Sequence, residues 1–362
     1  MRSFNVLAKG VVVAPTATRW TGPWLGATRR PSLQRVANRP IICHVLDALA
    51  QAGIVKIAVL TPPDAAEEIA ACIAEEGPAG IEVHYLVNDR RGESQDPLLA
   101  VAEFVGDAPC VLHRANGLLG QPLEFFTNTL QEESADALLL VQEDAREIKR
   151  LRLVPQRLPT PDEGERVTTI APPEGVAGVC LLGPGTLRRL ANLERPAPTL
   201  NFVALTERLA NDGGIVRTRA VQKWRHFTGD AMDLLDMNRT MLDELDCEIV
   251  PTTSGDNRFE GHISIHPTAS VLSSVIIGPV IIGADALITD SYIGPHTAIA
   301  ERVRIEGAEI ERSIVLADAS VLHVGGRLVA SIVGREARIF RDFSMPRALR
   351  LQVGDGDEVA LC

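Results

Sequence analysis

The C-terminal third of the chain carries a repeat of aliphatic residues at every fifth or sixth position. The repeat comprises Ile265, Val271, Ile277, Ile282, Ile288, Ile293, Ile299, Ile305, Ile310, Leu316 and Val321. An α-helix has a period of 3.6 and a strand a period of 2, so neither produces this spacing. A triangular coil does, because one aliphatic side chain on each side points into a shared core. The repeat therefore predicts a parallel β-helix of hexapeptide repeats over residues 251–362. Because such a solenoid needs closed ends, we expect residues 346–361 to cap it or to dock elsewhere.

The first 250 residues have a different texture, in which short apolar runs alternate with amphipathic segments. This alternation is typical of βαβ units, so we expect an α/β domain with a mostly parallel sheet over residues 1–250. Strands are expected at 11–13, 55–60, 82–87, 110–113, 137–141, 176–182 and 215–220. Helices are expected at 41–52, 98–105, 123–133, 202–211 and 230–245. Residues 143–173 are predicted to form loops or a hairpin, and residues 251–257 have the composition of a linker.

Composition narrows the classes of partner. The net charge of −11 argues against nucleic acid, which requires a basic face. The six cysteines form no CxxC pair, so we expect reduced thiols without a zinc site. The sequence shows neither an apolar run long enough for a membrane span nor a signal peptide, which predicts a cytoplasmic protein.

The segment VVVAPTATR (11–19) reads as a strand entering a turn suited to phosphate binding, but its glycines are missing. Backbone amides close around an anion most readily where glycine removes the Cβ atom. Here Ala14, Pro15 and Ala17 occupy the turn, and Pro15 has no amide hydrogen to donate. Thr18 and Arg19 follow, and the Arg19 guanidinium could still hold a phosphate.

Together with the C-terminal repeat, this arrangement resembles the sugar-phosphate nucleotidyltransferases. The long form of glucose-1-phosphate thymidylyltransferase, which ends in a left-handed β-helix and occurs in actinobacterial antibiotic pathways, is the nearest resemblance. The clearest matching segments are RVANRPIICHVLDALAQAGI (35–54), SYIGPHTAI (291–299), SIVGREARI (331–339) and PRALRLQVGDGDEV (346–359). The resemblance implies a Rossmann-like nucleotidyltransferase sheet followed by that β-helix.

The resemblance also implies a reaction. The phosphate of a sugar 1-phosphate attacks the α-phosphorus of a nucleoside triphosphate and pyrophosphate leaves, while Mg²⁺, cationic groups and backbone amides stabilise the charges. The two Mg²⁺-binding aspartates of the family fall on Ala115, within HRAN (113–116), and on Phe227, within RHFTG (225–229). Asn116, Thr228 and Gly229 remain at their family positions, whereas Arg114 would repel a cation.

Other family positions are also replaced. The glycines of the family's GGxGTR loop correspond to Ala14, Pro15 and Ala17, and the lysine of PKxLxPV falls on Pro31, although Arg29 or Arg30 could partly compensate. The EKP lysine has no counterpart in TTIAPPEG (168–175), and the acidic GExEITD segment aligns with PTLNFVA (198–204). These losses affect every part of the expected reaction.

Several polar side chains near these positions have two interpretations. Displaced metal ligands or a solvated helix face would both explain Asp230, Asp233 and Asp236, and the helix face is the simpler explanation. A metal site or an exposed strand edge would explain His262 and His266, and the strand edge is favoured. His113 and His226 each lie beside a lost aspartate, so they could line a remnant of the pocket or act in catalysis. The remnant is favoured, because the sequence supplies no nucleophile or orienting acid at matched spacing.

We therefore expect no catalytic residue, metal or cofactor, with Pro15 and Phe227 filling the space of triphosphate and Mg²⁺. The expected role is a noncatalytic partner, scaffold or ligand sensor in a sugar-nucleotide or secondary-metabolite pathway, paired with a second copy or an active paralogous subunit. Residual nucleotide or sugar-phosphate binding would involve Thr18, Arg19, Arg30, Asn116, Thr228 and Gly229. The alternative is a divergent active enzyme that uses Mg²⁺ together with Arg19, Arg29 or Arg30 and displaced acids such as Asp230.

Overall fold

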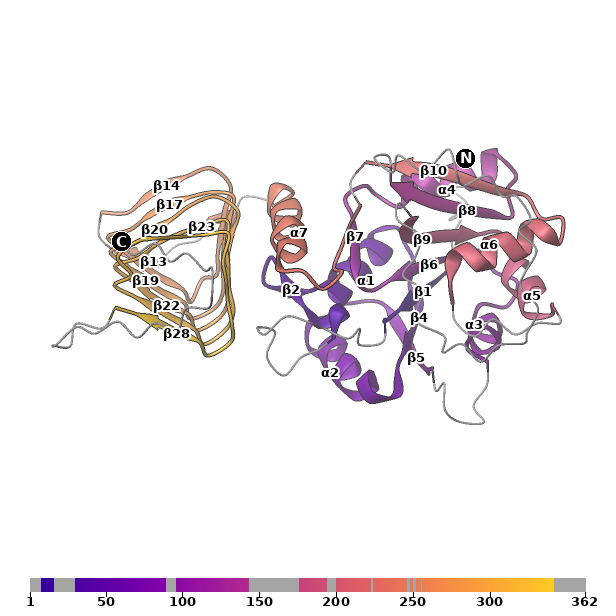
Figure 1. Ribbon diagram of the computed structural model, residues 1–362, viewed down its shortest axis with the longest axis horizontal. Coiled ribbons are helices and arrows are strands. Elements are labelled where there is room, and N and C mark those ends of the chain that lie inside the picture. Colours follow the sequence, from indigo (N-terminus) through magenta and orange to yellow (C-terminus); the bar gives the residue numbers. More distant parts are fainter. Residues whose placement is uncertain are drawn as a thin grey trace, which may run out of the picture.

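A computed structural model describes residues 8–15, 30–88, 96–142, 176–193, 200–222, 224–245, 248–249, 252–254 and 256–341. The chain forms an α/β domain followed by a three-sided parallel β-helix, with helix α7 between them (Figure 1). Within the described ranges, no helix is both long enough and apolar enough to cross a bilayer.

A seven-stranded sheet forms the centre of the α/β domain. In spatial order its strands are β10 (Val216–Val221), β8 (Ala137–Gln142), β9 (Val176–Leu182), β6 (Cys110–Arg114), β1 (Lys9–Val13), β4 (Lys56–Thr61) and β5 (Glu82–Val87). Strand β9 runs antiparallel to its neighbours β6 and β8, and the other pairs are parallel. The expected mostly parallel sheet is thus confirmed.

Seven helices of the described chain accompany this sheet. They are α1 (Ile41–Gln51), α2 (Ala66–Glu76), α3 (Pro97–Val105), α4 (Glu124–Glu132), α5 (Thr186–Ala191), α6 (Phe202–Asn211) and α7 (Ala231–Asp243). Short elements fill the connections: η1 (Pro31–Leu33), β2 (Arg35–Val36), β3 (Arg39–Pro40), η2 (Pro63–Ala65), β7 (Gly117–Leu119) and β11 (Trp224–His226).

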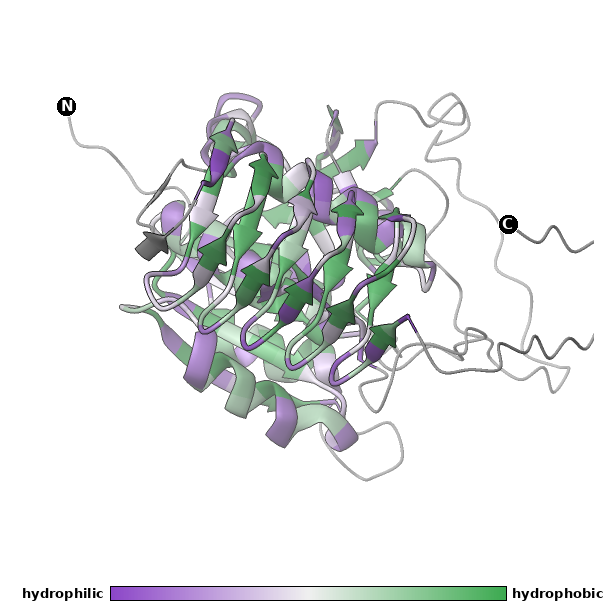
Figure 2. Ribbon diagram, turned by 90° about the vertical axis from the view of Figure 1, so that its left-hand side faces the viewer, coloured by the Kyte–Doolittle hydropathy of each residue, from purple (hydrophilic) through white to green (hydrophobic). Residues whose placement is uncertain are grey.

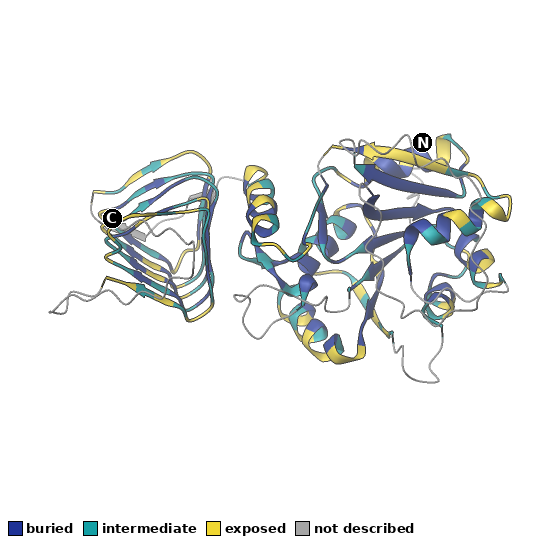
Figure 3. Cartoon of the chain, in the orientation of Figure 1, coloured by how far each residue is buried: buried dark blue, intermediate teal, exposed yellow. Residues whose placement is uncertain are grey.

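Helices cover both faces of the sheet, because successive residues of a strand point to opposite sides. Val12 lies in the core shared with α1, α2, α4 and α7, whereas its neighbour Val11 lies in the core shared with α3, α5 and α6. This double burial explains why the inner strands of the sheet are largely apolar, whereas the edge strands β5 and β10 are mostly exposed and carry polar residues. Figure 3 shows the central strands as the buried layer of the domain.

The predicted strands and the named helices all appear, with ends that differ by one or two residues. The prediction for residues 143–173 lies outside the described residues, and so does that for the tail 346–361. The linker composition of 251–257 was misleading, because Thr252–Ser254 forms strand β13 in the first coil of the β-helix. The backbone of β13 pairs with β16, so residues whose composition is typical of a turn form a strand here.

Three parallel sheets form the β-helix. The first contains β12 (Glu248–Ile249), β15 (Ile263–Ile265), β18 (Val280–Ile282), β21 (Thr297–Ile299), β24 (Ile314–Val315) and β27 (Ile332–Val333). The second contains β13, β16 (Ser270–Leu272), β19 (Leu287–Thr289), β22 (Arg304–Glu306), β25 (Ser320–Leu322) and β28 (Arg338–Phe340). The third contains β14 (Arg258–Glu260), β17 (Val275–Ile277), β20 (Tyr292–Ile293), β23 (Glu309–Glu311) and β26 (Arg327–Val329). This three-fold arrangement, whose triangular outline is visible in Figure 1, is that of the left-handed β-helix expected, and Figure 2 shows its successive coils side by side.

The interior of the β-helix is built of aliphatic ladders, and nine of the eleven predicted members are buried in it. The two exceptions are Ile277 and Leu316, which are half-buried while their neighbours Ile276 and Val315 point inward with no exposed surface. In both places two aliphatic residues are adjacent, so the spacing alone does not identify the inward one. The predicted period is correct, and two of its positions are wrong by one residue.

Helix α7 joins the two domains through a buried amide. The side chain of Asn238 is fully buried, accepts a hydrogen bond from the Ala37 amide (2.8 Å) and donates one to the His296 carbonyl (3.0 Å). Nearby, Asn38 Nδ2 donates to the carbonyl of Ile299 at 2.6 Å, and Ile314 of the β-helix packs in the α7-side core. These contacts fix the β-helix against the α/β domain.

Candidate active site

The candidate site lies at the carboxyl ends of the central strands β1 and β6, where parallel sheets place ligands. These strands pair in register from Lys9–Cys110 to Val13–Arg114. The pairing continues beyond both strands, since the Ala115 amide donates to the Val13 carbonyl and the Ala14 amide donates to that of Leu60, each at 2.9 Å. The turns predicted to hold phosphate and metal are therefore adjacent, but the Ala14 amide is already engaged.

The two positions expected to carry metal-binding carboxylates also meet here. The Phe227 amide donates to the Asn116 carbonyl at 2.8 Å, and Asn116 Nδ2 donates to the Phe227 carbonyl at 3.3 Å. The residues themselves are apolar and buried, with exposed fractions of 0% for Ala115 and 3% for Phe227. Both belong to the α1- and α7-side core, so the Phe227 ring packs inward.

These donors do not fit Mg²⁺, which prefers several hard oxygen ligands. Asn116 Oδ1 is buried with no hydrogen-bond partner among the described residues and is a single neutral oxygen, and Arg114, two residues earlier in the chain, adds a positive charge. Among the described residues, no group of three or more His, Cys, Asp or Glu side chains is placed to hold a metal.

Trp224 fills the space beside this turn. It lies on β11, which pairs antiparallel with β7, and its indole is 3% exposed. A Cβ atom on Gly117 would lie 2.3 Å from Trp224 Cη2, and one on Gly178 would lie 2.9 Å from Trp224 Cζ2. Both glycines are thus needed to admit the indole, which packs beside the His113 ring at a centroid distance of 5.8 Å.

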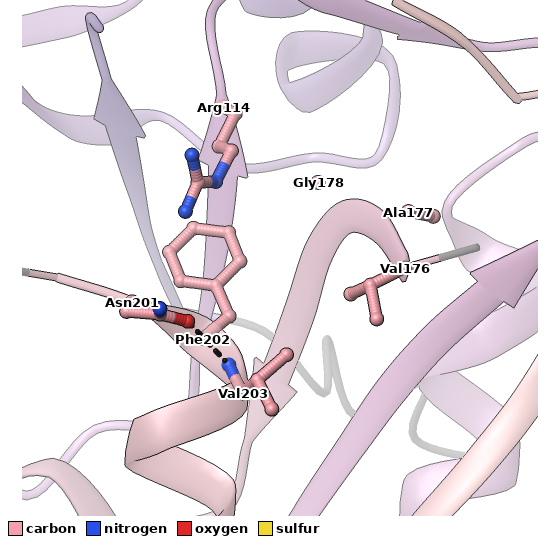
Figure 4. A pocket seen from close by; sticks show the side chains of 7 residues that line it. All are labelled: Arg114, Val176, Ala177, Gly178, Asn201, Phe202 and Val203. Atoms are coloured by element: carbon pink, nitrogen blue, oxygen red, sulfur yellow. Dashed lines mark hydrogen bonds between the residues drawn. The ribbon is translucent and has the colours of Figure 1, made fainter. Parts of the chain in front are cut away.

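Arg114 lines a small hollow next to the same turn, which we call the Arg114 pocket (Figure 4). Its volume is about 190 Å³, including space open to solvent, and it is lined by Arg114, Val176, Ala177, Gly178, Asn201, Phe202 and Val203. The guanidinium carbon of Arg114 lies 5.3 Å from the centre of the Phe202 ring. Asn201 caps helix α6, with its Oδ1 accepting from the amides of Val203 (3.1 Å) and Ala204 (3.4 Å).

Burial lowers the pKa of both histidines of the site. Burial lowers the pKa of His113 to about 4, and its Nδ1 lies 2.9 Å from the Arg114 carbonyl. Burial also lowers the pKa of His226, and the positive charge of Arg114 lowers it further, while Asp233 acts in the opposite direction. The rings of His113 and His226 both lie beside Trp224, and neither contacts a nucleophile or an orienting acid among the described residues.

The acids after Gly229 serve helix α7. Asp230 is the N-cap, with Oδ1 accepting from the Met232 amide at 3.1 Å. Asp233 Oδ2 accepts from the amide of Thr228 (2.8 Å) and from its hydroxyl (2.5 Å). Asp236 is exposed on the helix. This arrangement agrees with the helix-face interpretation and also shows what holds Thr228.

The remaining predicted residues are distributed as follows. Arg30 is engaged by acids near the start of α2, with Nε 2.8 Å from Glu68 and Nη1 3.1 Å from Asp64. Pro31 is buried at the start of η1, and Pro15 is half-buried after β1. Ala17, Thr18, Arg19 and Arg29 lie outside the described residues. At the β-helix, His266 Nδ1 bonds the Thr268 hydroxyl at 2.9 Å, and both His262 and His266 are exposed.

Sequence reasoning did not identify two contributors to the site. The sequence motifs identify Arg114 only as a group that would repel a metal ion, and no motif points to Trp224. The glycines that admit the indole, Gly117 and Gly178, were the available signal. That signal becomes visible only when β7, β9 and β11 are seen to converge.

Comparison with known proteins adds an independent line of evidence. Residues 24–149 match the Nucleotidyl transferase family. Glucose-1-phosphate thymidylyltransferase from Streptomyces antibioticus is 25% identical over 341 residues, covering 92% of this chain and 94% of that protein. The enzyme of the same name from Streptomyces griseus is 26% identical over 344 residues, covering 91% and 92%. The low-salt glycan biosynthesis nucleotidyltransferase Agl11 of Haloferax volcanii is 26% identical over 339 residues, covering 90% and 92%.

Proposed function

The chain is a nucleotidyltransferase relative of the glucose-1-phosphate thymidylyltransferases along almost its whole length, and from this premise we propose that it keeps their fold without their catalysis. In this proposal it is a noncatalytic partner, scaffold or ligand sensor in a sugar-nucleotide or secondary-metabolite pathway. No Mg²⁺ and no other cofactor takes part. The expected partner is a second copy of the chain or an active paralogous subunit.

One observation carries the proposal. The two positions where metal-binding carboxylates are expected lie side by side, joined through Asn116 and Phe227, and both hold buried apolar residues. In this proposal the family site keeps its position at the strand ends while its metal ligands are replaced. Loss of a single preorganised electrostatic group typically costs about 10²–10³ in rate, so loss of both carboxylates is expected to leave little turnover.

The parts of the fold that the chain retains support the noncatalytic role. The β-helix is complete over the described residues and is fixed to the α/β domain through Asn238 and Asn38. Its flat faces offer a surface for assembly with another subunit. A binding role of this kind requires the fold but not catalytic turnover, since fold alone does not determine activity.

The test is a pyrophosphate-release assay. Purified protein is incubated with Mg²⁺, each nucleoside triphosphate and a panel of sugar 1-phosphates, and the proposal predicts no release above the protein-free rate. Turnover that Arg19→Ala abolishes would contradict it. Thermal shift with the same ligands then separates a sensor from a scaffold, because a bound ligand raises the melting temperature.

A divergent active nucleotidyltransferase is the second candidate, and the similarity to the named thymidylyltransferases over more than 90% of this chain favours it. It would use Arg19 and Arg29, which lie outside the described residues, with Mg²⁺ held by carboxylates from elsewhere. Arg30 and Asp230 are weaker contributors, since ion pairs and helix capping already engage them. The same assay decides between the two candidates.

A further inference from the structure

Two thiols lie next to each other in the α/β domain, outside the candidate site. The Sγ atoms of Cys43 on helix α1 and Cys72 on helix α2 are 4.0 Å apart, although the two residues are 29 positions apart in the chain. The two helices pack against each other, and both side chains belong to the core on that side of the sheet. A disulfide bond is about 2 Å long, so the remaining approach is of the size that rotation of one cysteine side chain supplies.

The two sulfurs differ in their access to solvent. Cys43 has no exposed surface, whereas Cys72 is half-buried and reaches the surface of helix α2. Cys110 and Cys180, on the central strands β6 and β9, are also fully buried. Among the cysteines of the described chain, only Cys72 can therefore meet a reagent from solution without opening the fold, and a second thiol lies directly beneath it.

The electrostatics of the pair assign different roles to the two thiols. The hydrogen bond between the sulfurs lowers the pKa of Cys72 and raises that of Cys43, and burial raises the pKa of Cys43 further. The positive charge of Arg35 also lowers the pKa of Cys72, whereas burial and the carboxylates of Glu76 and Glu75 act in the opposite direction. Because the thiolate is the nucleophilic form of cysteine, the exposed sulfur is the one suited to attack and the buried sulfur keeps the proton.

We propose that Cys72 and Cys43 form a thiol–disulfide exchange site, at which a low-molecular-weight disulfide oxidises the pair to an intramolecular disulfide. The Cys72 thiolate bonds to one sulfur of the reagent and releases the other as a thiolate. Cys43 then gives its proton to solvent and bonds to Cys72 Sγ, and the second thiolate leaves. The two cysteines lose two electrons in total, and the reagent is reduced to two thiols. This redox site goes beyond the proposed function and does not depend on it.

The bond would form beside the attachment of the β-helix. Helix α1 follows the hairpin of β2 and β3, in which the Ala37 amide donates to the Asn238 side chain of α7. The same hairpin is held to the end of α2, since Arg35 Nη1 lies 2.7 Å from Glu76 Oε1. A covalent link between α1 and α2 therefore ties together the two helices that support this hairpin. It also restricts the unfolded chain, so the oxidised protein should melt about 3–5 °C above the reduced protein.

The test is peptide mapping of the full-length protein after reaction with oxidised glutathione. Free thiols are blocked with N-ethylmaleimide, and the protein is digested without reduction and analysed by mass spectrometry. We expect a crosslinked pair of peptides that contain Cys43 and Cys72, with at least about tenfold more oxidation at Cys72 than at the buried Cys110. Peptide mass also identifies Cys247 and Cys362, which lie outside the described residues. Absence of the crosslink, or a crosslink from Cys72 to another cysteine, would overturn the inference.

Single variants separate the two roles. Cys43→Ala removes the resolving thiol, so glutathione should remain attached to Cys72, whereas in Cys72→Ser the buried Cys43 should stay unmodified. Cys110→Ala is the matched control and should form the crosslink as the parent does. A glutathione adduct on Cys43 in Cys72→Ser would overturn the assignment of the nucleophile.

Calorimetry of the oxidised and reduced parent keeps the test decisive if a variant fails to fold. A lower melting temperature for the oxidised protein would show that the fold does not accommodate the bond, and it would overturn the inference. Pyrophosphate release would instead contradict the noncatalytic function and would leave the peptide map unchanged, so the two proposals fail in different assays.

Discussion

The buried amide of Asn238 gives the most specific prediction about how the two domains hold together. Replacing it by alanine removes the acceptor of the Ala37 amide and the donor to the His296 carbonyl. Asn238 has no exposed surface, so water does not replace these partners without rearrangement. An alanine there therefore leaves one buried donor and one buried acceptor unsatisfied.

Each unsatisfied buried polar group costs about 1–3 kcal/mol, which gives a loss of about 2–6 kcal/mol for Asn238→Ala. At about 2.1 cal/mol/K per residue, the 362 residues give an unfolding entropy of about 0.76 kcal/mol/K, so a loss of about 1 kcal/mol lowers the melting temperature by about 1.3 °C. The variant should therefore melt at least about 2.5 °C below the parent by differential scanning calorimetry.

The control is Asn211→Ala, which removes an exposed asparagine at the end of helix α6 and should change stability by less than about 0.5 kcal/mol. Equal melting temperatures for Asn238→Ala and Asn211→Ala would refute the idea that Asn238 joins the domains. Calorimetry that resolves the two domains into separate transitions only in Asn238→Ala would support it further.

Three other predictions concern the α/β domain. Gly178→Ala places a Cβ atom 2.9 Å from Trp224 Cζ2, so it should destabilise the fold by about 1–3 kcal/mol and change the tryptophan fluorescence; an unchanged spectrum and melting temperature would contradict the packing described. Burial lowers the pKa of both His44 and His113 to about 4, below the unfolded value of 6.5, so stability is full above pH 6.5 and falls by about 3 kcal/mol per histidine as the pH drops to 4. Thermal melts of His44→Gln or His113→Gln should show a shallower loss over that range, and an unchanged slope would disprove the assignment. Burial raises the pKa of Cys110 to about 12, so iodoacetamide at pH 8 should label it only after unfolding, as mass spectrometry would show.

The β-helix was the most predictable part of the molecule, because each coil repeats the same physical requirement. Each side of a coil needs one aliphatic side chain that points inward, and the regular spacing of these residues is visible in the sequence. The limit appears at Ile276–Ile277 and Val315–Leu316, where two aliphatic neighbours both satisfy the pattern. The direction of each side chain is then decided by register with the coils above and below, which periodicity does not contain.

The linker prediction failed for a related reason. Thr252–Ser254 has turn-like composition, yet its backbone is drawn into β13 by pairing with β16. Tertiary pairing here outweighs local propensity. In the α/β domain the opposite holds, since strands buried on both faces must be apolar throughout, and their positions could be predicted within a residue or two.

At the site, the sequence motifs identify which family positions are replaced, but they do not show what the residues around those positions do. Ala115 and Phe227 were identified from short motifs, and their adjacency depends on the pairing of β7 with β11. Arg114 meets the Phe202 ring only because helix α6 begins against β9. Contacts between residues so distant in the chain are not encoded in any local pattern.

Anomalous diffraction tests most directly whether the fold persists while its metal-binding chemistry is absent. Crystals grown with Mn²⁺, a nucleoside triphosphate and a sugar 1-phosphate would be measured at the manganese absorption edge. No manganese peak is expected within coordination distance of Asn116 Oδ1, a buried side-chain oxygen at the turn that has no hydrogen-bond partner among the described residues. A manganese ion bound there, bridging to a triphosphate, would contradict this expectation.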